Sequence, residues 1–299
     1  MSIAHLKPIG IEDYEIINDY LQKYPSENCD FNICTLFSWG QYFKVEYTIF
    51  KDRLILFNPY YRYLLFPIGE KFSASELYNI NNCCEEIHQK VEIMVVSESY
   101  INETNDITDY FSIINDTDWN DYIYSTESLV NLQGKKLAKK KNLISQFKKQ
   151  YQNWEIMPIE NNDINELIDF ANYWKNKHFD SSNSEDEEYL AIEMESLKIS
   201  LQHWDLLPNE GIKLYVDGKI CAFAIFSPQT HNMATIHFEK YDPLIKGAAQ
   251  LINHETAKLL LNRFSLINRE QDIGLTGIRQ AKKSYQPLRM LPFYRLKAK

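Results

Sequence analysis

Apolar residues recur along the chain in two periods, one helical and one typical of strands, and each change of period marks an expected element. In the first half, helical spacing comes first, runs of β-branched and aromatic residues follow, and a serine-capped helical segment precedes one more apolar run. The expected elements are a helix at 11–24, a short helix ending near Gly40, strands at 44–50, 51–58 and 61–69, a helix at 73–90 and a strand at 91–97. This pattern predicts an α+β unit whose first strands form a meander.

The second half of the chain has a clearer pattern. The expected elements are a strand at 154–159, helices at 163–179 and 187–204, a hairpin at 211–227 around the turn Asp217–Gly218, a strand at 233–241, a helix from Gly247 to about Asn262, a strand at 264–271, a short helix at 277–285 and a strand at 289–297. The order strand, two helices, three antiparallel strands, helix, strand, helix, strand is that of a GNAT acyltransferase domain. Such an order predicts a fold and says little about function.

Length and composition indicate an ordered protein of two domains. A chain of 299 residues is long for one compact domain and comfortable for two. The hydrophobic fraction of 44% and the aromatic fraction of 14% are typical of globular proteins. We expect an N-terminal domain at 1–131, a basic interdomain helix at 132–151 and a C-terminal domain at 152–299, both domains being α+β with mixed sheets.

Charge and cysteine content exclude several classes of protein. A formal net charge of -9 argues against nonspecific coating of nucleic acid by the whole surface, but it allows a local basic patch. The five cysteines form no C-x-x-C pair and predict neither a disulfide framework nor a zinc site, so no metal is expected. No uncharged run is long enough to cross a bilayer. We therefore expect a cytoplasmic protein, and the sequence leaves its oligomeric state open.

The segment LQGKKLAKKKNLISQFKKQY, residues 132–151, is unusually basic for an acidic protein. On a helical wheel, its apolar arc consists of Leu137, Ile144, Phe147 and Tyr151. Lys135, Lys139 and Lys149 fall on the opposite side, where they can sit in water or contact phosphates. Lys140 falls inside the apolar arc, so its ammonium group must reach water, pair with a carboxylate or face a polar cavity.

Two polar side chains, His237 and Glu239, are expected on one face of the strand at 233–241, because side chains alternate along a strand. In a GNAT domain this strand splays from the next one and the donor carbonyl lies in the split, so a carboxylate there can accept the proton of an amine or hydroxyl. Glu239 is therefore a candidate general base, and the alternative is that it only neutralises Lys140 or Arg269. For His237, the alternative is an ordinary strand histidine with a satisfied hydrogen bond.

The segment 267–287 has the densest set of polar residues. They are Arg269, Glu270 and Asp272 at the end of a strand and Arg279, Lys282, Lys283, Ser284 and Tyr285 on a short helix. Arg can grip phosphate with two hydrogen bonds, Lys adds a point charge, and Tyr or Ser can donate to a developing oxyanion. The alternative is a salt-bridge cluster that holds the C-terminal strand.

Three segments, at 121–147, 236–253 and 267–287, resemble the phosphatidylglycerol lysyltransferase C-terminal domain family. The resemblance extends over nearly the whole chain, and KKKN at 139–142 matches the family's basic motif followed by Asn. It implies two tandem GNAT-like acyltransferase domains and transfer of an aminoacyl group from a charged tRNA to a lipid, peptide or small-molecule acceptor. The multi-helix membrane part of the lipid-modifying enzymes is not among these residues, which leaves the acceptor open.

The residues and the resemblance together predict a site with three sets of side chains. The catalytic set is Glu239, Lys140, Arg269 and Tyr285. The substrate-binding set is Asn142, Lys141, His237, Lys240, Glu270, Asp272, Arg279, Lys282 and Ser284. The set that contacts phosphates of tRNA is Lys135, Lys139 and Lys149.

The expected donor substrate is aminoacyl-tRNA, with no tightly bound cofactor. Acyl-CoA is the alternative donor, for a coenzyme A dependent N-acyltransferase, but the usual signature of an Arg or Gln followed by two spaced glycines is reduced to IKGAAQ at 245–250. A further alternative is a noncatalytic module that binds tRNA or anionic lipid. The expected partners are therefore tRNA and, for a protein peripheral at the inner membrane face, anionic lipid.

Overall fold

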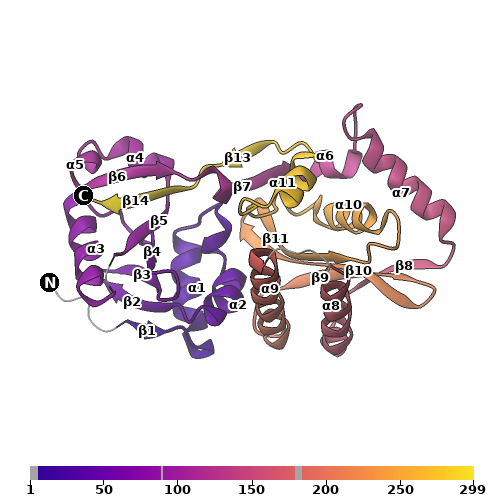
Figure 1. The fold of residues 1–299 in the computed structure, drawn as a ribbon, viewed down its shortest axis with the longest axis horizontal. Coiled ribbons are helices and arrows are strands. Elements are labelled where there is room, and N and C mark those ends of the chain that lie inside the picture. The colour runs from indigo at the N-terminus through magenta and orange to yellow at the C-terminus, as the bar shows by residue number, and fades with distance from the viewer. Residues whose placement is uncertain (1–5, 89, 179–183) are drawn as a thin grey trace. The chain divides into compact units, whose positions relative to one another are not determined.

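The computed structural model of the chain describes residues 6–88, 90–178 and 184–299. It divides into two compact units (Figure 1): unit 1 runs to Asp121 and also contains Leu291–Lys299, whereas unit 2 is Tyr122–Met290. Each unit contains one mixed β-sheet with helices packed on it, so the expected fold class of two α+β domains is confirmed.

Unit 1 is built on a sheet whose first strands form the expected meander. In spatial order its strands are β1 (Lys7–Pro8), β2 (Glu46–Phe50), β3 (Arg53–Asn58), β4 (Tyr63–Leu65), β5 (Glu92–Val96), β14 (Tyr294–Ala298) and β6 (Phe111–Asn115). Its α-helices are α1 (Tyr14–Lys23), α2 (Ile33–Tyr42), α3 (Ala74–His88), α4 (Glu98–Glu103) and α5 (Ile107–Tyr110). Every residue from Leu54 to Asn58 is buried, which requires both faces of β3 to be covered.

Unit 2 has the same kind of sheet, with helices on both faces. In spatial order its strands are β13 (Arg289–Leu291), β7 (Asp121–Ser125), β12 (Leu266–Asn268), β11 (Met233–Tyr241), β10 (Lys219–Thr230), β9 (Glu210–Val216) and β8 (Trp154–Pro158). Its α-helices are α6 (Thr126–Asn131), α7 (Ala138–Gln150), α8 (Ile164–His178), α9 (Ser184–Gln202), α10 (Ala248–Leu260) and α11 (Thr276–Lys283). α7 and α10 lie on one face of this sheet, and α8 and α9 lie on the other (Figure 1).

The units are divided differently from the expected boundary after residue 131. β7 already pairs with β12, so the chain enters the sheet of unit 2 before the basic segment begins. The basic segment is not an interdomain helix, because Leu137, Ile144 and Phe147 belong to a core cluster shared with α10. The C-terminal strand β14 returns to unit 1, where backbone hydrogen bonds hold it between β5 and β6. Long-range strand pairing of this kind leaves no local signal in the sequence.

The basic segment is also shorter as a helix than the range 132–151. Leu132 closes α6 in a left-handed conformation with a φ of 45°, and Gly134 follows with a φ of 86°. The helix itself, α7, begins only at Ala138. The interruption separates Lys135 and Lys136 from the helix that carries the other lysines of the segment.

Strands β11 and β12 separate, as expected for this fold. They pair in parallel through three residues only, ending at Thr235 and Asn268. The rest of β11 continues without β12, and a bulge in its pairing with β10 leaves His237 without an opposite residue. The bulge shifts the alternation of side chains, so Ile236 packs against α10 residues and Glu239 also bonds α10. The prediction that His237 and Glu239 share one face is therefore wrong.

α10 begins directly against α7. Its first residue follows Gly247, which has a φ of 91° and is buried. A Cβ atom at this position would lie 2.7 Å from the carbonyl oxygen of Leu143 and 2.9 Å from Cβ of Phe147. The glycine thus permits close packing of the two helices.

None of the described helices is long and apolar enough to span a bilayer.

Candidate functional site

A compact set of charged and aromatic side chains lies in unit 2 where β11 separates from β12. Arg269, just after β12, donates from Nη2 to Oε1 of Glu239 on β11 at 2.9 Å. The ring of Tyr285, after α11, lies 4.2 Å from Nζ of Lys140 and 5.2 Å from Cζ of Arg269. The structure therefore brings together the four residues of the expected catalytic set: Glu239, Lys140, Arg269 and Tyr285.

Two further residues complete this cluster, and sequence reasoning missed both. Asn253 on α10 donates from Nδ2 to the second carboxylate oxygen of Glu239 at 3.3 Å. Tyr124 on β7 places its ring 5.8 Å from Cζ of Arg269. Each residue sits in a segment that has the pattern of ordinary secondary structure, a helix interior and a strand interior. Only the pairing of β7 with β12 and the packing of α10 bring them to the charged residues.

The charges of this cluster are largely withdrawn from water. The side chains of Arg269 and Glu239 are only 12% and 15% exposed. Burial is the largest single influence on the pKa of the Arg269 guanidinium and lowers it, but interactions with Glu239, Tyr124 and Tyr285 together raise it by more, so the net shift is upward. The Arg269 guanidinium therefore stays charged, and its hydrogen bond holds the Glu239 carboxylate in position.

Lys140 is the exception in this cluster. Its side chain is half-buried, and in the described part of the chain it forms no ion pair with a carboxylate. Burial lowers its pKa below the ordinary value, and repulsion by Arg269 and Lys139 adds to this, while Glu239 opposes it. The expectation that Lys140 differs from its exposed lysine neighbours is confirmed. Its ammonium group rests on the face of Tyr285, a position that stabilises a cation without neutralising it.

The two tyrosines of the cluster stay protonated. Burial raises the pKa of both Tyr285 and Tyr124 well above the ordinary value, and the Arg269 guanidinium only partly opposes the shift. The hydroxyl of Tyr124 donates to the backbone oxygen of Lys282 at 2.8 Å, which ties β7 to α11. Both phenols can therefore act as hydrogen-bond donors at neutral pH, not as bases.

A second network holds the loop between β12 and α11. Arg279 donates from Nη2 and Nε to the two oxygens of Asp272 at 2.7 and 2.9 Å, and the Tyr122 hydroxyl donates to the same carboxylate. Burial raises the pKa of Asp272, but the bonds from Arg279 and Tyr122 outweigh it, so the net shift is downward. The Lys282 ammonium group donates to the backbone oxygen of Gln271. Arg279, Asp272 and Lys282 thus stabilise the loop that carries Arg269.

His237 and Lys240 lie away from the Glu239 carboxylate. His237 contacts Ser227 Oγ through Nε2 at 2.7 Å and Glu270 Oε1 through Nδ1 at 3.1 Å. Lys240 is buried, with Nζ 2.7 Å from the Glu193 carboxylate and 3.9 Å from the centre of the Trp174 ring. Both partners of Lys240 come from α9 and α8, on the sheet face opposite α10. Strand alternation puts Lys240 there, so it belongs to the packing of that face and not to the Glu239 cluster.

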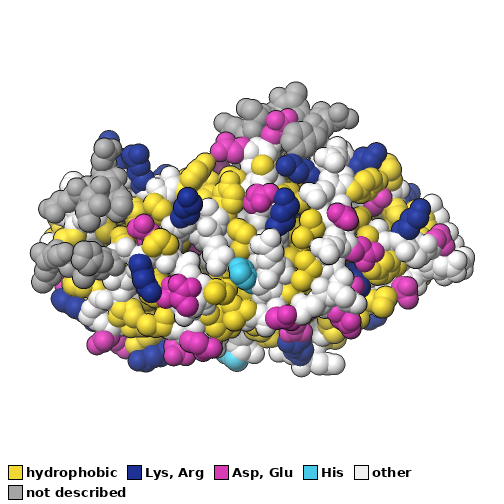
Figure 2. Space-filling model, turned by 90° about the horizontal axis from the view of Figure 1, so that it is seen from below, with side chains coloured by type: hydrophobic (Ala, Val, Ile, Leu, Met, Phe, Trp, Pro, Cys, Tyr) yellow, Lys and Arg dark blue, Asp and Glu magenta, His cyan; other side chains and the backbone are white. Residues whose placement is uncertain are grey.

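The remaining predicted residues lie on or near the surface. The hydroxyl of Ser284 donates to the backbone oxygen of Ala281 at 2.6 Å, so it is used within its own helix. The exposed residues are Lys135, Lys139, Lys141, Asn142 and Lys149. On the face shown in Figure 2, by contrast, acidic and basic side chains are interspersed. The lysine-rich surface of α7 thus differs from the mixed charge of that face.

The arrangement suits stabilisation of negative charge next to a fixed carboxylate. Glu239 has both oxygens held, by Arg269 and Asn253, and each oxygen keeps a lone pair for another proton donor. Lys140 adds to the cluster an ammonium group that lies on the Tyr285 ring and forms no ion pair in the described part of the chain. Among the described residues, no group of His, Cys, Asp and Glu is placed to hold a metal ion.

Comparison with known proteins agrees with this fold. A conserved protein of unknown function from Bacteroides thetaiotaomicron VPI-5482 superimposes with a TM-score of 0.87 at 28% identity, covering 98% of this chain and 99% of that one. L-PGS from Bacillus licheniformis superimposes with a TM-score of 0.65 at 14% identity, covering 98% and 93%, which shows similarity of fold. An uncharacterized protein of Mycoplasmoides gallisepticum is 28% identical over 177 residues, which are 59% of this chain and 55% of that relative.

The family assignment rests on a match over most of the chain. The family model described as phosphatidylglycerol lysyltransferase, C-terminal, matches residues 21–297. This range includes most of unit 1, all of unit 2 and every residue of the Glu239 cluster. The chain therefore belongs to the phosphatidylglycerol lysyltransferase C-terminal family.

Proposed function

We propose that the protein transfers an aminoacyl group from aminoacyl-tRNA to an acceptor with a free amine or hydroxyl. One observation carries this proposal: the half-buried ammonium group of Lys140 forms no ion pair among the described residues, and it belongs to the same cluster as the Glu239–Arg269 ion pair. Such a charge in a partly desolvated place is costly unless a negative group arrives. An oxyanion formed during acyl transfer is such a group.

The reaction needs no covalent enzyme intermediate, because an aminoacyl ester is already activated. The nucleophile of the acceptor attacks the ester carbonyl carbon and loses its proton to Glu239. The carbon–oxygen bond to the ribose then breaks, and the departing ribose oxygen receives that proton from Glu239. Lys140 stabilises the tetrahedral oxyanion, and the ring of Tyr285 holds the Lys140 ammonium group through a cation–π contact.

Arg269 and Asn253 act on this chemistry through Glu239. Each occupies one oxygen of the carboxylate, so the remaining lone pairs point in defined directions. Positioning of this kind can remove a large part of the activation free energy of a transfer reaction. In this proposal Arg269 and Asn253 are positioning residues, and Glu239 is the general base.

The exposed lysines on and before α7 suit a polyanionic donor. Lys135, Lys139 and Lys149 are exposed, and Lys140 on the same helix reaches the Glu239 cluster. A tRNA bound along the helix would therefore have its phosphates near the lysines. We place the reaction in the cytoplasm, where charged tRNA is found. An anionic lipid at the inner membrane face is one acceptor consistent with the family name.

The start of α10 favours tRNA over acyl-CoA as the donor. A helix N-terminus can bind pyrophosphate only when its backbone N–H groups are accessible. Here Gly247 packs against the backbone of α7, at the position where IKGAAQ departs from the acetyltransferase signature. The observation supports the aminoacyl-tRNA donor and argues against coenzyme A.

The test compares ligands by thermal shift and then measures transfer. Charged tRNA, uncharged tRNA, acetyl-CoA and phosphatidylglycerol liposomes are added separately, because stabilisation rises with ligand concentration over its dissociation constant. We expect charged tRNA to stabilise the protein most, and radiolabelled aminoacyl groups to pass to an acceptor in the liposomes or in a set of amines. Stabilisation by acetyl-CoA alone would establish the coenzyme A reaction instead. Equal stabilisation by both tRNAs without transfer would leave a binding module.

The lysine patch is tested by salt dependence. Replacing Lys135, Lys139 and Lys149 with Ala is expected to weaken tRNA binding and to flatten its dependence on salt, because fewer counterions are released. Lys140→Ala is expected to leave the salt slope nearly unchanged while transfer is lost. An unchanged slope in the triple variant would remove the phosphate contact from the proposal.

A further inference from the structure

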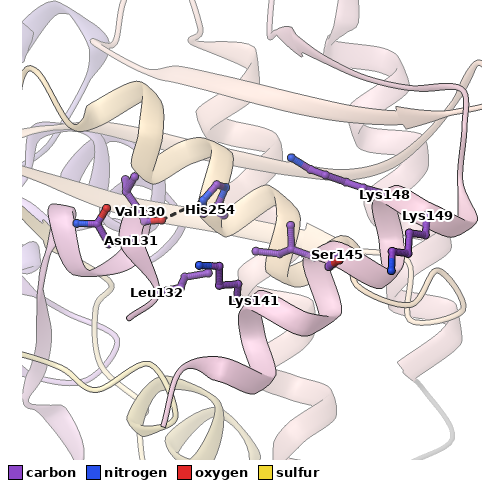
Figure 3. Close-up of a pocket in the computed structure, with 9 residues that line it drawn as sticks. Val130, Asn131, Leu132, Lys141, Ser145, Lys148, Lys149 and His254 are labelled. Carbon is purple, nitrogen blue, oxygen red and sulfur yellow. Dashed lines mark hydrogen bonds between the residues drawn. The ribbon is translucent and has the colours of Figure 1, made fainter. Parts of the chain in front are cut away.

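A pocket of about 380 Å³ lies between α6, α7 and α10 of unit 2 (Figure 3). It is lined by Val130, Asn131, Leu132, Lys141, Ile144, Ser145, Lys148, Lys149 and His254. The α7 residues at its wall recur at helical spacing, so one side of the helix forms the wall along its length. Lys140, one residue before the first of them, lies instead against Tyr285. The pocket is thus separate from the Glu239 cluster, and a ligand could bind there whether or not the protein carries out the proposed transfer reaction.

The pocket combines apolar walls with positive charge. Val130, Leu132 and Ile144 supply apolar surface, and Lys141, Lys148 and Lys149 supply ammonium groups. No carboxylate is among its lining residues as the structure describes them. A small space with several cations and no lining anion has a positive potential, which favours a ligand with more than one negative charge.

The three lysines differ in how far their charge is already used. Lys148 has Nζ 3.6 Å from the Glu255 carboxylate and 4.9 Å from the centre of the Trp154 ring. Lys141 and Lys149 form no ion pair in the described part of the chain. These two ammonium groups are therefore available to a ligand without breaking an existing contact.

The frame of the pocket is held by its own hydrogen bonds. His254 on α10 contacts the backbone oxygen of Val130 through Nε2 at 3.1 Å (Figure 3). Because a carbonyl oxygen only accepts, Nε2 carries a proton and donates it. This bond ties the end of α6 to α10. Ligand groups would then meet a preformed wall, which lowers the entropy lost on binding.

We propose that this pocket binds a small organic phosphate, with the phosphate group held by ammonium groups of the α7 wall and the organic part against the apolar wall. A phosphate monoester carries nearly two negative charges at neutral pH, which suits two unneutralised ammonium groups better than a carboxylate does. Ser145 and Asn131 are within the lining and supply neutral hydrogen-bond partners. The volume suits a molecule of glycerol phosphate or nucleotide size.

The test is titration calorimetry with adenosine 5′-monophosphate, glycerol 3-phosphate and inorganic phosphate, and with adenosine and glycerol as neutral controls. We expect at least one ester to bind more tightly than inorganic phosphate, and the neutral compounds not to bind. Lys141→Gln is expected to weaken binding by about tenfold, the value of one charged hydrogen bond. Ser145→Tyr is expected to abolish it, because the ring fills the pocket without a change of charge. The ester that binds identifies the organic part.

Lys136→Gln is the matched control, since Lys136 is exposed and precedes the same helix but does not line the pocket. An equal loss in Lys136→Gln and Lys141→Gln would show general attraction to a basic surface and overturn the site. Equal affinity for inorganic phosphate and both esters would overturn the role of the apolar wall. Binding of tRNA but of none of the small phosphates would also overturn the proposal and assign Lys149 to nucleic-acid contact alone. Circular dichroism of Ser145→Tyr confirms that a loss is not due to unfolding.

Discussion

Units 1 and 2 share one plan and use it differently. In each unit, a crossover helix connects the last strand of an antiparallel meander to a parallel neighbour. In unit 1, α3 connects β4 to β5, and in unit 2, α10 connects β11 to β12. β4 is three residues long and pairs with β5 over its whole length. β11 is nine residues long and pairs with β12 over only three. The longer strand in unit 2 therefore leaves a stretch that the shorter one lacks.

The two units also differ in the side chains that lie where the strand before the crossover helix runs past its parallel neighbour. After β4, Phe66 packs against Tyr100 with ring centres 4.7 Å apart, and the neighbouring strand residues are apolar and buried. In unit 2, Glu239 and Arg269 occupy the corresponding region as an ion pair. In the part of the chain that the structure describes, strand length and residue type thus give unit 2 a buried ion pair where unit 1 has apolar packing.

The largest expected difference between the units concerns transfer. Lys140→Ala should lower the rate of aminoacyl transfer by about 100-fold or more, the range for removal of one group that stabilises an oxyanion. Arg53→Gln is the matched change in unit 1, because Arg53 also lies over an aromatic ring, with Cζ 4.7 Å from the centre of Phe72. It should leave the rate unchanged. Single-turnover rates with charged tRNA measure both, and an equal loss in the two variants would end the assignment of chemistry to unit 2.

Next in size is the effect of breaking the buried pair on stability. Arg269→Ala leaves the Glu239 charge buried without its partner and should lower the free energy of unfolding by about 4 kcal/mol. In unit 1, Lys71 and Glu103 form a pair whose side chains are 48% and 63% exposed. Lys71→Ala should therefore cost less than about 1 kcal/mol. Urea denaturation of both variants gives the comparison, which fails if Arg269→Ala unfolds at the wild-type midpoint.

The starts of the two crossover helices give a smaller contrast. Gly247→Ala should destabilise by about 2–3 kcal/mol, from a left-handed backbone and from collision with Leu143 and Phe147. α3 starts in solvent, where Ser73 and Glu76 cap each other, so Ser73→Ala should cost about 1 kcal/mol.

Gly218→Ala isolates the backbone part of the Gly247 effect, because Gly218 has a φ of 72° and no heavy atom within 4 Å of an added Cβ. Thermal unfolding should rank Gly247→Ala as clearly more damaging than Gly218→Ala. Equal losses would show that α7 moves aside easily and that the packing is looser than described.

The smallest expected effect is a difference in acid sensitivity. The hydrogen bond from His254, together with Lys258 and Lys148, lowers the pKa of Glu255 from 4.5 to about 2. A carboxylate with a depressed folded-state pKa contributes stability above its unfolded pKa, and this is lost as the pH falls from 4.5 toward about 2. Glu255→Gln should therefore flatten the acid side of the stability curve.

Glu76 in unit 1 serves as the comparison for acid sensitivity. The hydrogen bond from Lys51 also lowers its pKa, but the pair is exposed at the surface. Glu76→Gln should change the acid side less than Glu255→Gln, because water screens an exposed pair. Midpoints of urea unfolding measured across the acid range would contradict this if the two variants followed the same curve.

Much of the fold was accessible from the sequence because its signals are local. The meander of unit 1, the hairpin around Asp217–Gly218 and the helices on both sides of it depend on periodicity and turn residues within short windows. The burial of Leu137, Ile144 and Phe147 also follows from one helical wheel. The sequence did not predict that β7 joins the sheet of unit 2 or that β14 joins the sheet of unit 1, because pairing between distant strands leaves no local periodicity.

The candidate site was predictable to the extent that its residues are conspicuous. A lysine in an apolar arc and a carboxylate near the end of a strand are unusual, so Lys140 and Glu239 stand out in the sequence. Asn253 and Tyr124 do not, because an amide in a helix and a tyrosine in a strand are common. The predicted face of His237 was wrong because a bulge of one residue reverses the alternation of side chains along a strand. The sequence contains no signal that predicts this bulge.

The position of β14 has a consequence for how the protein is made. In the sheet of unit 1, β14 lies between β5 and β6. The ribosome nevertheless synthesises β6 long before residues 294–298, which form β14. During synthesis, therefore, the sheet of unit 1 lacks β14 until all residues of unit 2 have been translated. A released chain that ends at Met290 would hold every residue of unit 2 but lack one strand of unit 1, the reverse of the order in which their residues are translated.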